Sequence, residues 1–235
     1  MTTTTEMAGS TAKTNAKVAG LLYLVIIICG LFSEMFVRGS LIVPGDGDTT
    51  VQQILAAKGL YRAGFASDMI MAICDVGVGV LFYILLRPVN RVLALGAAFL
   101  RLAQATIIGL NLLNYYNVLN ILESAAHASA FPPEQIQAQV MLYLQMHSHG
   151  YLISGMFFGF SCMLLGYLFC KSPYFPNVLG VMMTVASVGY LVDCFTNFLA
   201  PEYAGMSELL VVSTAVITEF ALCLWLLIKG VRNQQ

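Results

Sequence analysis

Charged residues are scarce in this sequence. Only 10% of its 235 residues are Asp, Glu, Lys or Arg, whereas a typical soluble domain is about 25% charged. Hydrophobic residues make up 59% of the chain, and its mean hydropathy is +0.81. A water-soluble core could not absorb so much apolar surface, so the composition excludes a soluble globular domain and predicts a membrane protein.

Basic stripes and the common catalytic motifs are also missing. The net charge is -1 and no segment is rich in Lys or Arg, which excludes a nucleic-acid-binding face. The six cysteines lie inside or at the edge of apolar runs, and none forms a C-x-x-C pair, so we expect buried thiols instead of disulfides or a zinc site. The patterns H-x-x-x-H, H-E-x-x-H and G-x-S-x-G do not occur. We therefore expect no metal and no cofactor.

The sequence contains instead six apolar segments long enough to cross a bilayer, which takes about 20 residues each. They lie at 17–38, 61–86, 92–119, 147–170, 176–199 and 207–229. Backbone groups in lipid must bond within the segment and long alternating segments are absent, so these spans are helices. The sequence predicts an all-α polytopic membrane protein, a six-transmembrane-helix bundle over 17–230. We expect a disordered polar tail at 1–16 and a short tail at 231–235.

The loops between the spans differ in charge. One side carries seven basic residues and the other three, which by the positive-inside rule predicts that both termini lie in the cytoplasm, at the inner membrane of the cell. The outer loop at 39–60 predicts a short interfacial helix, capped by Asp48 or Thr49 and ended by Gly59. The seven inner basic residues are Lys13, Lys17, Arg87, Arg91, Lys171, Lys229 and Arg232, and the three outer ones are Arg38, Lys58 and Arg62.

Several stretches together resemble the bacterial domain-of-unknown-function family 4386. The stretches are LIVPGDGDTTVQQILA, RAGFASDMI, LLRPVNRVLALGAAFLRL, FFGFSCMLLGYLFCKSPYFPNVLGVMMTVASVGYLVD and LWLLIKG. The resemblance covers nearly the whole chain after the polar tail, and its most specific block is 157–193. Members are uncharacterised multi-pass proteins, so the resemblance implies an architecture and no activity.

Two ionisable residues are predicted to meet in the middle of the membrane. The short turn RPVNR makes the spans 61–86 and 92–119 an antiparallel hairpin. Asp75 lies twelve residues before this turn and Arg101 ten residues after Arg91, so both lie about 15–18 Å from the turn. Charges inside a membrane are costly and usually have partners. We therefore expect an ion pair between Asp75 and Arg101, with Gln104 and Asn111 on the same helical stripe as Arg101.

A second group of polar residues is expected near the outer ends of the spans. Glu34, Asp68 and Asp193 are predicted to converge with His147 or His149 on one polar cavity open to the outer face. Three acids in such a cavity can stay protonated, pair with Arg38 or Arg62, or share a cation. His147 and His149 are two residues apart and project from different sides of a helix, which makes them a poor zinc pair. Glu219, halfway along the last span, is the remaining deep acid.

These residues leave three functions open. The first is binding or translocation of a small solute, a cation or a proton through the polar cavity, because deep acids do this in pumps and transporters. The second is a structural, sensory or assembly role without a substrate. The third is an intramembrane metal-dependent hydrolase. The predicted partners are the lipid bilayer and a small solute or cation, with no nucleic acid, and the sequence does not indicate an oligomeric state.

Overall fold

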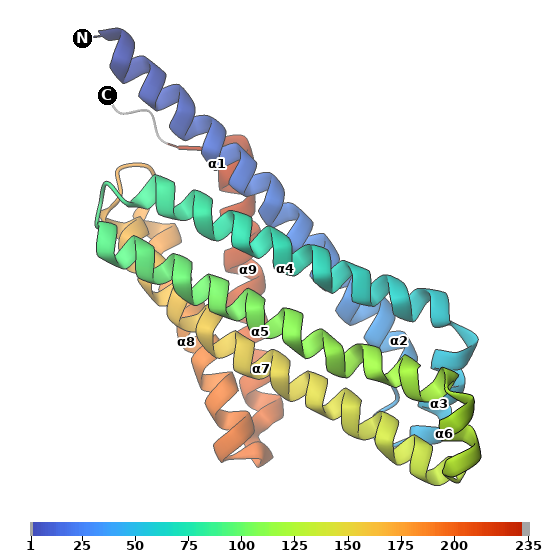
Figure 1. Ribbon diagram of the computed structural model, residues 1–235. Coiled ribbons are helices and arrows are strands. Elements are labelled where there is room, and N and C mark those ends of the chain that lie inside the picture. The colour runs from blue at the N-terminus through green and yellow to red at the C-terminus, as the bar shows by residue number, and fades with distance from the viewer. Residues whose placement is uncertain (1, 232–235) are drawn as a thin grey trace. The chain divides into compact units, whose positions relative to one another are not determined.

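The computed structural model describes residues 2–231, with side chains from residue 11 onward. This part of the chain consists of helices and short connections and contains no strand (Figure 1). Six of its helices are long and apolar enough to cross a membrane, at Thr11–Leu41, Lys58–Leu86, Arg91–Glu123, Pro133–Lys171, Asn177–Leu199 and Pro201–Ile228. The fold is therefore all-α with six transmembrane helices, as the composition predicts.

The order of the elements follows the predicted spans, with short helices between them. They are α1 (Thr2–Leu31), the π-helix η1 (Phe32–Arg38), α2 (Gly39–Leu41), α3 (Gly47–Ala56), α4 (Lys58–Leu86), α5 (Arg91–Glu123), α6 (Ala125–Ala130), α7 (Pro133–Lys171), α8 (Asn177–Leu199), the 3-10 turn η2 (Pro201–Tyr203) and α9 (Ala204–Ile228).

Two helices start well before the predicted spans. The polar segment 1–16, expected to be disordered, is helical from Thr2 on, because no proline interrupts the chain before Pro44 and an apolar helix extends by one hydrogen bond per added residue. The helix α7 begins at Pro133, a position that proline favours because its missing N–H has no partner there anyway. With 39 residues α7 is about 58 Å long, so it extends beyond the roughly 30 Å hydrocarbon core.

The chain divides into two compact units, and the long helices contribute to both. Unit 1 comprises the described residues up to Val25, together with 74–105 and the described residues from Leu152 on. Within it α8 lies beside α9 (Figure 1). Gly180 of α8 packs against Gly166 of α7 so closely that a Cβ atom on Gly180 would lie 2.7 Å from the Gly166 carbonyl oxygen. Small residues at such crossings allow transmembrane helices to approach each other.

Unit 2 comprises 26–73 and 106–151, and its core is built around two tyrosines. The rings of Tyr61 on α4 and Tyr115 on α5 stack with centroids 4.0 Å apart. The hydroxyl of Tyr61 donates to the carbonyl of Tyr115 at 2.9 Å, and that of Tyr115 to the carbonyl of Tyr61 at 3.2 Å. Ile54 of α3 is fully buried in the same cluster. The short helix predicted in the outer loop therefore packs on the core of unit 2 through one face.

The ends of α3 differ from the sequence prediction. Asp46, and neither Asp48 nor Thr49, is the N-cap, and its side chain accepts a hydrogen bond from the backbone N–H of Thr49. Gly59 does not end the helix: α3 stops at Ala56, the backbone breaks at Ala57, and Gly59 lies in the first turn of α4. Asp46, Asp48 and Thr49 can all serve as N-caps by residue type. The backbone conformation decides between them, because the N-cap residue has an extended backbone and Asp46 has one.

Candidate functional site

The ion pair predicted between α4 and α5 is present in unit 1. The guanidinium of Arg101 donates to Oδ1 of Asp75 from Nε at 2.9 Å and from Nη2 at 2.6 Å. The amide of Gln104 donates to the other carboxylate oxygen at 2.9 Å. All three side chains are buried. Asp75 is therefore fully paired inside the protein, and the prediction is confirmed.

Aromatic rings surround this ion pair. The guanidinium carbon of Arg101 lies 5.4 Å from the ring centre of Tyr23 and 5.0 Å from that of Phe158. Such cation–π contacts gain strength when the cation is desolvated. Three buried polar atoms here have no hydrogen-bond partner in the described residues, namely Nη1 of Arg101, Oε1 of Gln104 and the hydroxyl of Tyr23. The Asp75–Arg101 ion pair is therefore enclosed by aromatic rings, and three polar atoms around it lack a hydrogen-bond partner among the described residues.

Two further predicted acids of unit 1 are held by neutral groups. Glu219 on α9 accepts a hydrogen bond from the Tyr190 hydroxyl at 2.6 Å. Asp193 on α8 accepts hydrogen bonds from the Ser207 hydroxyl at 2.7 Å and from the Asn197 amide at 3.1 Å. Neither acid forms an ion pair in the part of the chain that the structure describes. Asp193 thus makes its hydrogen bonds within the α8–α9 pair.

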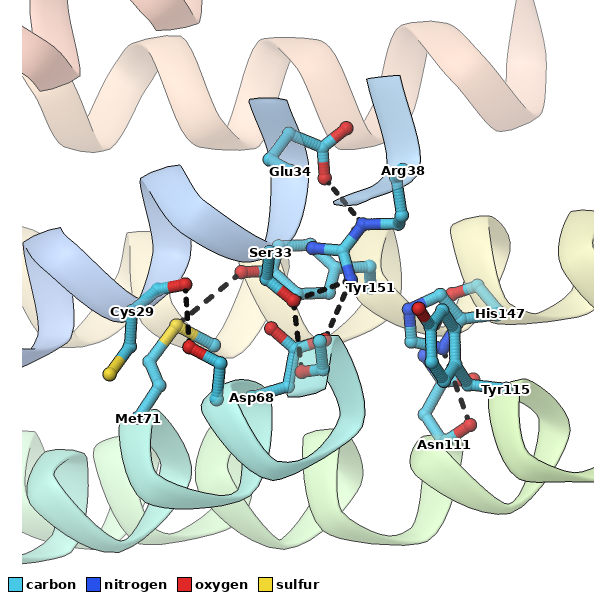
Figure 2. A network of polar contacts seen from close by, with 12 residues as sticks. Cys29, Ser33, Glu34, Arg38, Asp68, Met71, Asn111, Tyr115, His147 and Tyr151 are labelled. Atoms are coloured by element: carbon cyan, nitrogen blue, oxygen red, sulfur yellow. Dashed lines mark hydrogen bonds and ion pairs between the residues drawn. The ribbon is translucent and has the colours of Figure 1, made fainter. Parts of the chain in front are cut away.

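In unit 2 a single arginine joins two acids on different helices (Figure 2). Arg38, the last residue of η1, donates from Nε to Glu34 at 2.8 Å and from Nη1 to Oδ2 of Asp68 on α4 at 2.6 Å. Its Nη1 also donates to the hydroxyl of Ser33 at 3.1 Å, and that hydroxyl donates in turn to the carbonyl of Gly64. We call Ser33, Glu34, Arg38 and Asp68 the Arg38 cluster.

The π-helical turn explains how one short segment supplies three members of the Arg38 cluster. In η1 the backbone hydrogen bonds span five residues, as between the N–H of Gly39 and the carbonyl of Glu34. This wider turn lets Ser33 and Arg38, five residues apart, contact each other. Short π-helical insertions occur often at functional sites. The sequence does not reveal this element, because nothing in the composition of 32–38 distinguishes a π-helix from an α-helix.

Burial increases steeply through the Arg38 cluster. The side chain of Glu34 is 68% exposed, that of Arg38 is 10% exposed and that of Asp68 is 1% exposed. Oδ1 of Asp68 has no hydrogen-bond partner in the described residues. The cluster contains two carboxylates and one guanidinium, so it carries a net charge of about -1 when both acids are ionised.

A histidine and three other polar side chains adjoin the Arg38 cluster (Figure 2). The guanidinium of Arg38 lies 5.9 Å from the ring centre of Tyr151, and that ring lies 6.3 Å from the ring of His147. The His147 ring is 5.2 Å from Tyr115. Asn111 donates from its amide to the carbonyl of His147 at 2.7 Å. Nε2 of His147 is buried without a partner among the described residues.

The remaining predicted site residues lie elsewhere. His149 is exposed on α7 whereas His147 is buried, as expected for residues two positions apart on a helix. Arg62 does not pair with the predicted acids: its Nη2 donates to both carboxylate oxygens of Glu123 at 2.9 Å, and Lys58 lies 3.4 Å from the same carboxylate. Within residues 2–231 no group of three or more His, Cys, Asp or Glu side chains could hold a metal ion.

Comparison with known proteins places the chain. Residues 18–230 match the family described as a domain of unknown function, DUF4386. The chain belongs to the DUF4386 family. An uncharacterized protein of Archaeoglobus fulgidus is 28% identical over an alignment of 167 residues that covers 68% of this chain and 80% of that protein. No solved structure matches the sequence. The DUF4386 match covers most of the first transmembrane helix and all of the other five, so the resemblance noted from the sequence is confirmed and the Arg38 cluster lies within the family's domain.

Proposed function

We propose that this protein binds a proton or a small cation at Asp68 and takes part in moving it, or a solute coupled to it, across the membrane. One observation carries the proposal. The carboxylate of Asp68 is buried, one of its oxygens is held by Arg38, and the other has no partner among the described residues. Acids buried in membrane helices commonly bind cations or relay protons.

The charge of the Arg38 cluster favours a positively charged ligand. One guanidinium faces two carboxylates, and a buried charge without a partner is costly. A proton on Oδ1 of Asp68, or a cation beside it, would neutralise the remaining charge. The ring of His147 lies 6.3 Å from that of Tyr151, and its Nε2, which has no partner among the described residues, supplies a second group that can carry a proton.

The exposure of the side chains in the Arg38 cluster suggests the direction from which a proton or cation enters. Glu34 is open to the surroundings, Arg38 is nearly covered and Asp68 is enclosed. Protonation of Asp68 would weaken its ion pair with Arg38. The guanidinium of Arg38 would then form an ion pair with Glu34 only. We infer that Arg38 exchanges between the two acids as the ligand binds and leaves. The positive-inside pattern of the loops supports an orientation in which η1 lies at the outer face of the cytoplasmic membrane.

The test measures proton and cation binding at Asp68. Infrared difference spectra of the purified protein, recorded during a pH titration, should show the carbonyl band of a protonated carboxyl group that is absent in Asp68→Asn. Titration calorimetry with sodium and potassium ions should show binding that the same substitution abolishes. Asp48→Asn is the matched control, since Asp48 is an exposed acid of the same unit.

Flux through the protein decides between binding and transport. Proteoliposomes that contain a pH-sensitive dye should show proton movement with the wild type and with Asp48→Asn, and none with Asp68→Asn. If the spectra show no carboxyl band that Asp68→Asn removes, and neither sodium nor potassium binds, the proposal is wrong.

A structural role without a substrate is the second candidate. It is favoured by Asp75, whose two oxygens accept three hydrogen bonds from Arg101 and Gln104 and are thus closed to a ligand. Under this alternative Asp68→Asn would lower only the stability of the protein, with no change in ion binding or flux. The same measurements therefore separate the two functions.

A further inference from the structure

A cavity of about 520 Å³ lies in unit 1, and none of the acids discussed above is part of its lining. One wall is the turn Pro88–Asn90 between α4 and α5. The other consists of the end of α7 and the residues after it, with Tyr167, Lys171 and Tyr174 as its polar members. The volume is within the range of small-molecule sites.

The cavity has a positive charge and no negative one. Lys171 is the charged residue of its lining, and no Asp or Glu contributes to it. The ammonium group lies 6.0 Å from the ring centre of Tyr167 and forms no ion pair with any described residue. Arg87 and Arg91 flank the turn and are exposed. An anion entering the cavity would meet an unneutralised cation.

The lining also offers hydrogen-bond donors. Oδ1 of Asn90 accepts from the backbone N–H of Leu93, which caps α5 and leaves the amide NH₂ of Asn90 for a ligand. The hydroxyls of Tyr167 and Tyr174 can donate as well. Two prolines and a valine supply apolar surface beside these groups. The cavity therefore combines one cation, several neutral donors and an apolar wall.

The cavity lies at the ends of transmembrane helices, where lipid headgroups are found. It is formed where the transmembrane helices α4 and α7 end, at Leu86 and Lys171, and where α5 begins at Arg91. Tyr and Lys at such positions lie at the level of the lipid headgroups. The basic loops assign this end to the cytoplasmic side, where anionic lipids attract Lys and Arg.

We propose that this cavity binds the phosphate of an anionic lipid headgroup. Lys171 pairs with the phosphate, the donors of Asn90 and the tyrosines bind its oxygens or the headgroup hydroxyls, and the apolar wall contacts the glycerol backbone. The lining of the cavity shares no residue with the Arg38 cluster, so its test does not depend on the proposed ion binding.

The experiment counts lipids bound to the purified full-length protein by native mass spectrometry. Phosphatidylglycerol should bind tightly and phosphatidylcholine weakly. Lys171→Gln should weaken phosphatidylglycerol binding about fivefold, as expected for one lysine near an anionic headgroup, and Lys171→Arg should restore it. Lys17→Gln is the matched control, because Lys17 is an exposed lysine outside the cavity lining, and should leave binding unchanged.

Competition with inorganic phosphate identifies the source of the anion. Phosphate at millimolar concentration should not displace phosphatidylglycerol. Displacement would mean a site for a free anion and would overturn the lipid assignment. Equal binding of phosphatidylcholine, or an unchanged affinity in Lys171→Gln, would overturn the proposal as a whole.

Discussion

Arg101 binds a single oxygen of Asp75 through two nitrogens, Nε at 2.9 Å and Nη2 at 2.6 Å, while Gln104 holds the other oxygen. The ion pair joins α4 to α5 across 26 residues of sequence and is buried on both sides. Each buried charge in this pair is stabilised by the opposite charge of its partner. Loss of one partner is therefore expected to be far more harmful than loss of both.

The substitution Arg101→Met should lower the free energy of unfolding by about 3–5 kcal/mol, because it leaves the Asp75 carboxylate buried and unpaired. Unfolding of the detergent-solubilised protein by a denaturing detergent measures this. The double variant Asp75→Leu with Arg101→Met should recover most of the loss, since replacing a buried pair by apolar groups is often neutral. Arg87→Met, at an exposed arginine, is the control. A cost below about 1 kcal/mol for Arg101→Met would contradict the expected energetics.

The contact between α7 and α8 should not accept a methyl group. In Gly180→Ala the new Cβ would lie 2.7 Å from the Gly166 carbonyl oxygen and 2.8 Å from the Cys170 nitrogen, and backbone atoms cannot move aside as a side chain can. Overpacking of this kind costs about 1–3 kcal/mol. Gly155→Ala on α7 is the matched control, because no atom lies within 4 Å of its added Cβ. Equal unfolding midpoints for the two variants would show that the helices separate without penalty.

The cap of α3 should fail only in strong acid. The carboxylate of Asp46 accepts hydrogen bonds from the hydroxyl of Thr49 at 2.6 Å and from its backbone N–H at 2.9 Å, which hold the pKa of Asp46 below its usual value. A lowered pKa in the folded state means that the cap stabilises the protein fully above the unfolded pKa of about 3.9, and that this contribution is lost as the pH falls through the lower folded-state value.

Nuclear magnetic resonance can follow the cap through the amide signal of Thr49. The signal should stay constant down to about pH 4 and shift only below it. In Asp46→Asn, which keeps the hydrogen-bond acceptor and removes the charge, the shift should disappear. A Thr49 signal that moves at higher pH would mean that the hydrogen bonds do not favour the charged form.

The orientation of the chain can be tested with two introduced cysteines. Gln52 on α3 and Asn90 in the turn between α4 and α5 are both exposed. A membrane-impermeant maleimide added to intact cells should label Gln52→Cys, and should label Asn90→Cys only after the cells are permeabilised, because the basic loops are expected in the cytoplasm. The wild type supplies the background, since each of its six cysteines is buried or half-buried. The reverse labelling pattern would invert the orientation.

The amino-acid sequence by itself determined the architecture and one internal contact. Six spans follow from apolar length alone, because lipid requires about 20 apolar residues in a helix whatever the helix packs against. The pairing of Asp75 with Arg101 followed from counting residues on either side of a short turn, since the rise of a helix is constant and the hairpin leaves no other register.

Only the tertiary structure decided which acid each outer arginine binds. From the sequence, Arg38 and Arg62 were both candidates to pair with the outer acids, yet Arg38 binds Asp68 and Arg62 binds Glu123, which is 61 residues away. The choice depends on the π-helical turn at 32–38 and on the extension of α5 to Glu123. Neither has a periodic signature in the sequence, because a single wider turn shifts the direction of a side chain without changing which residues are apolar.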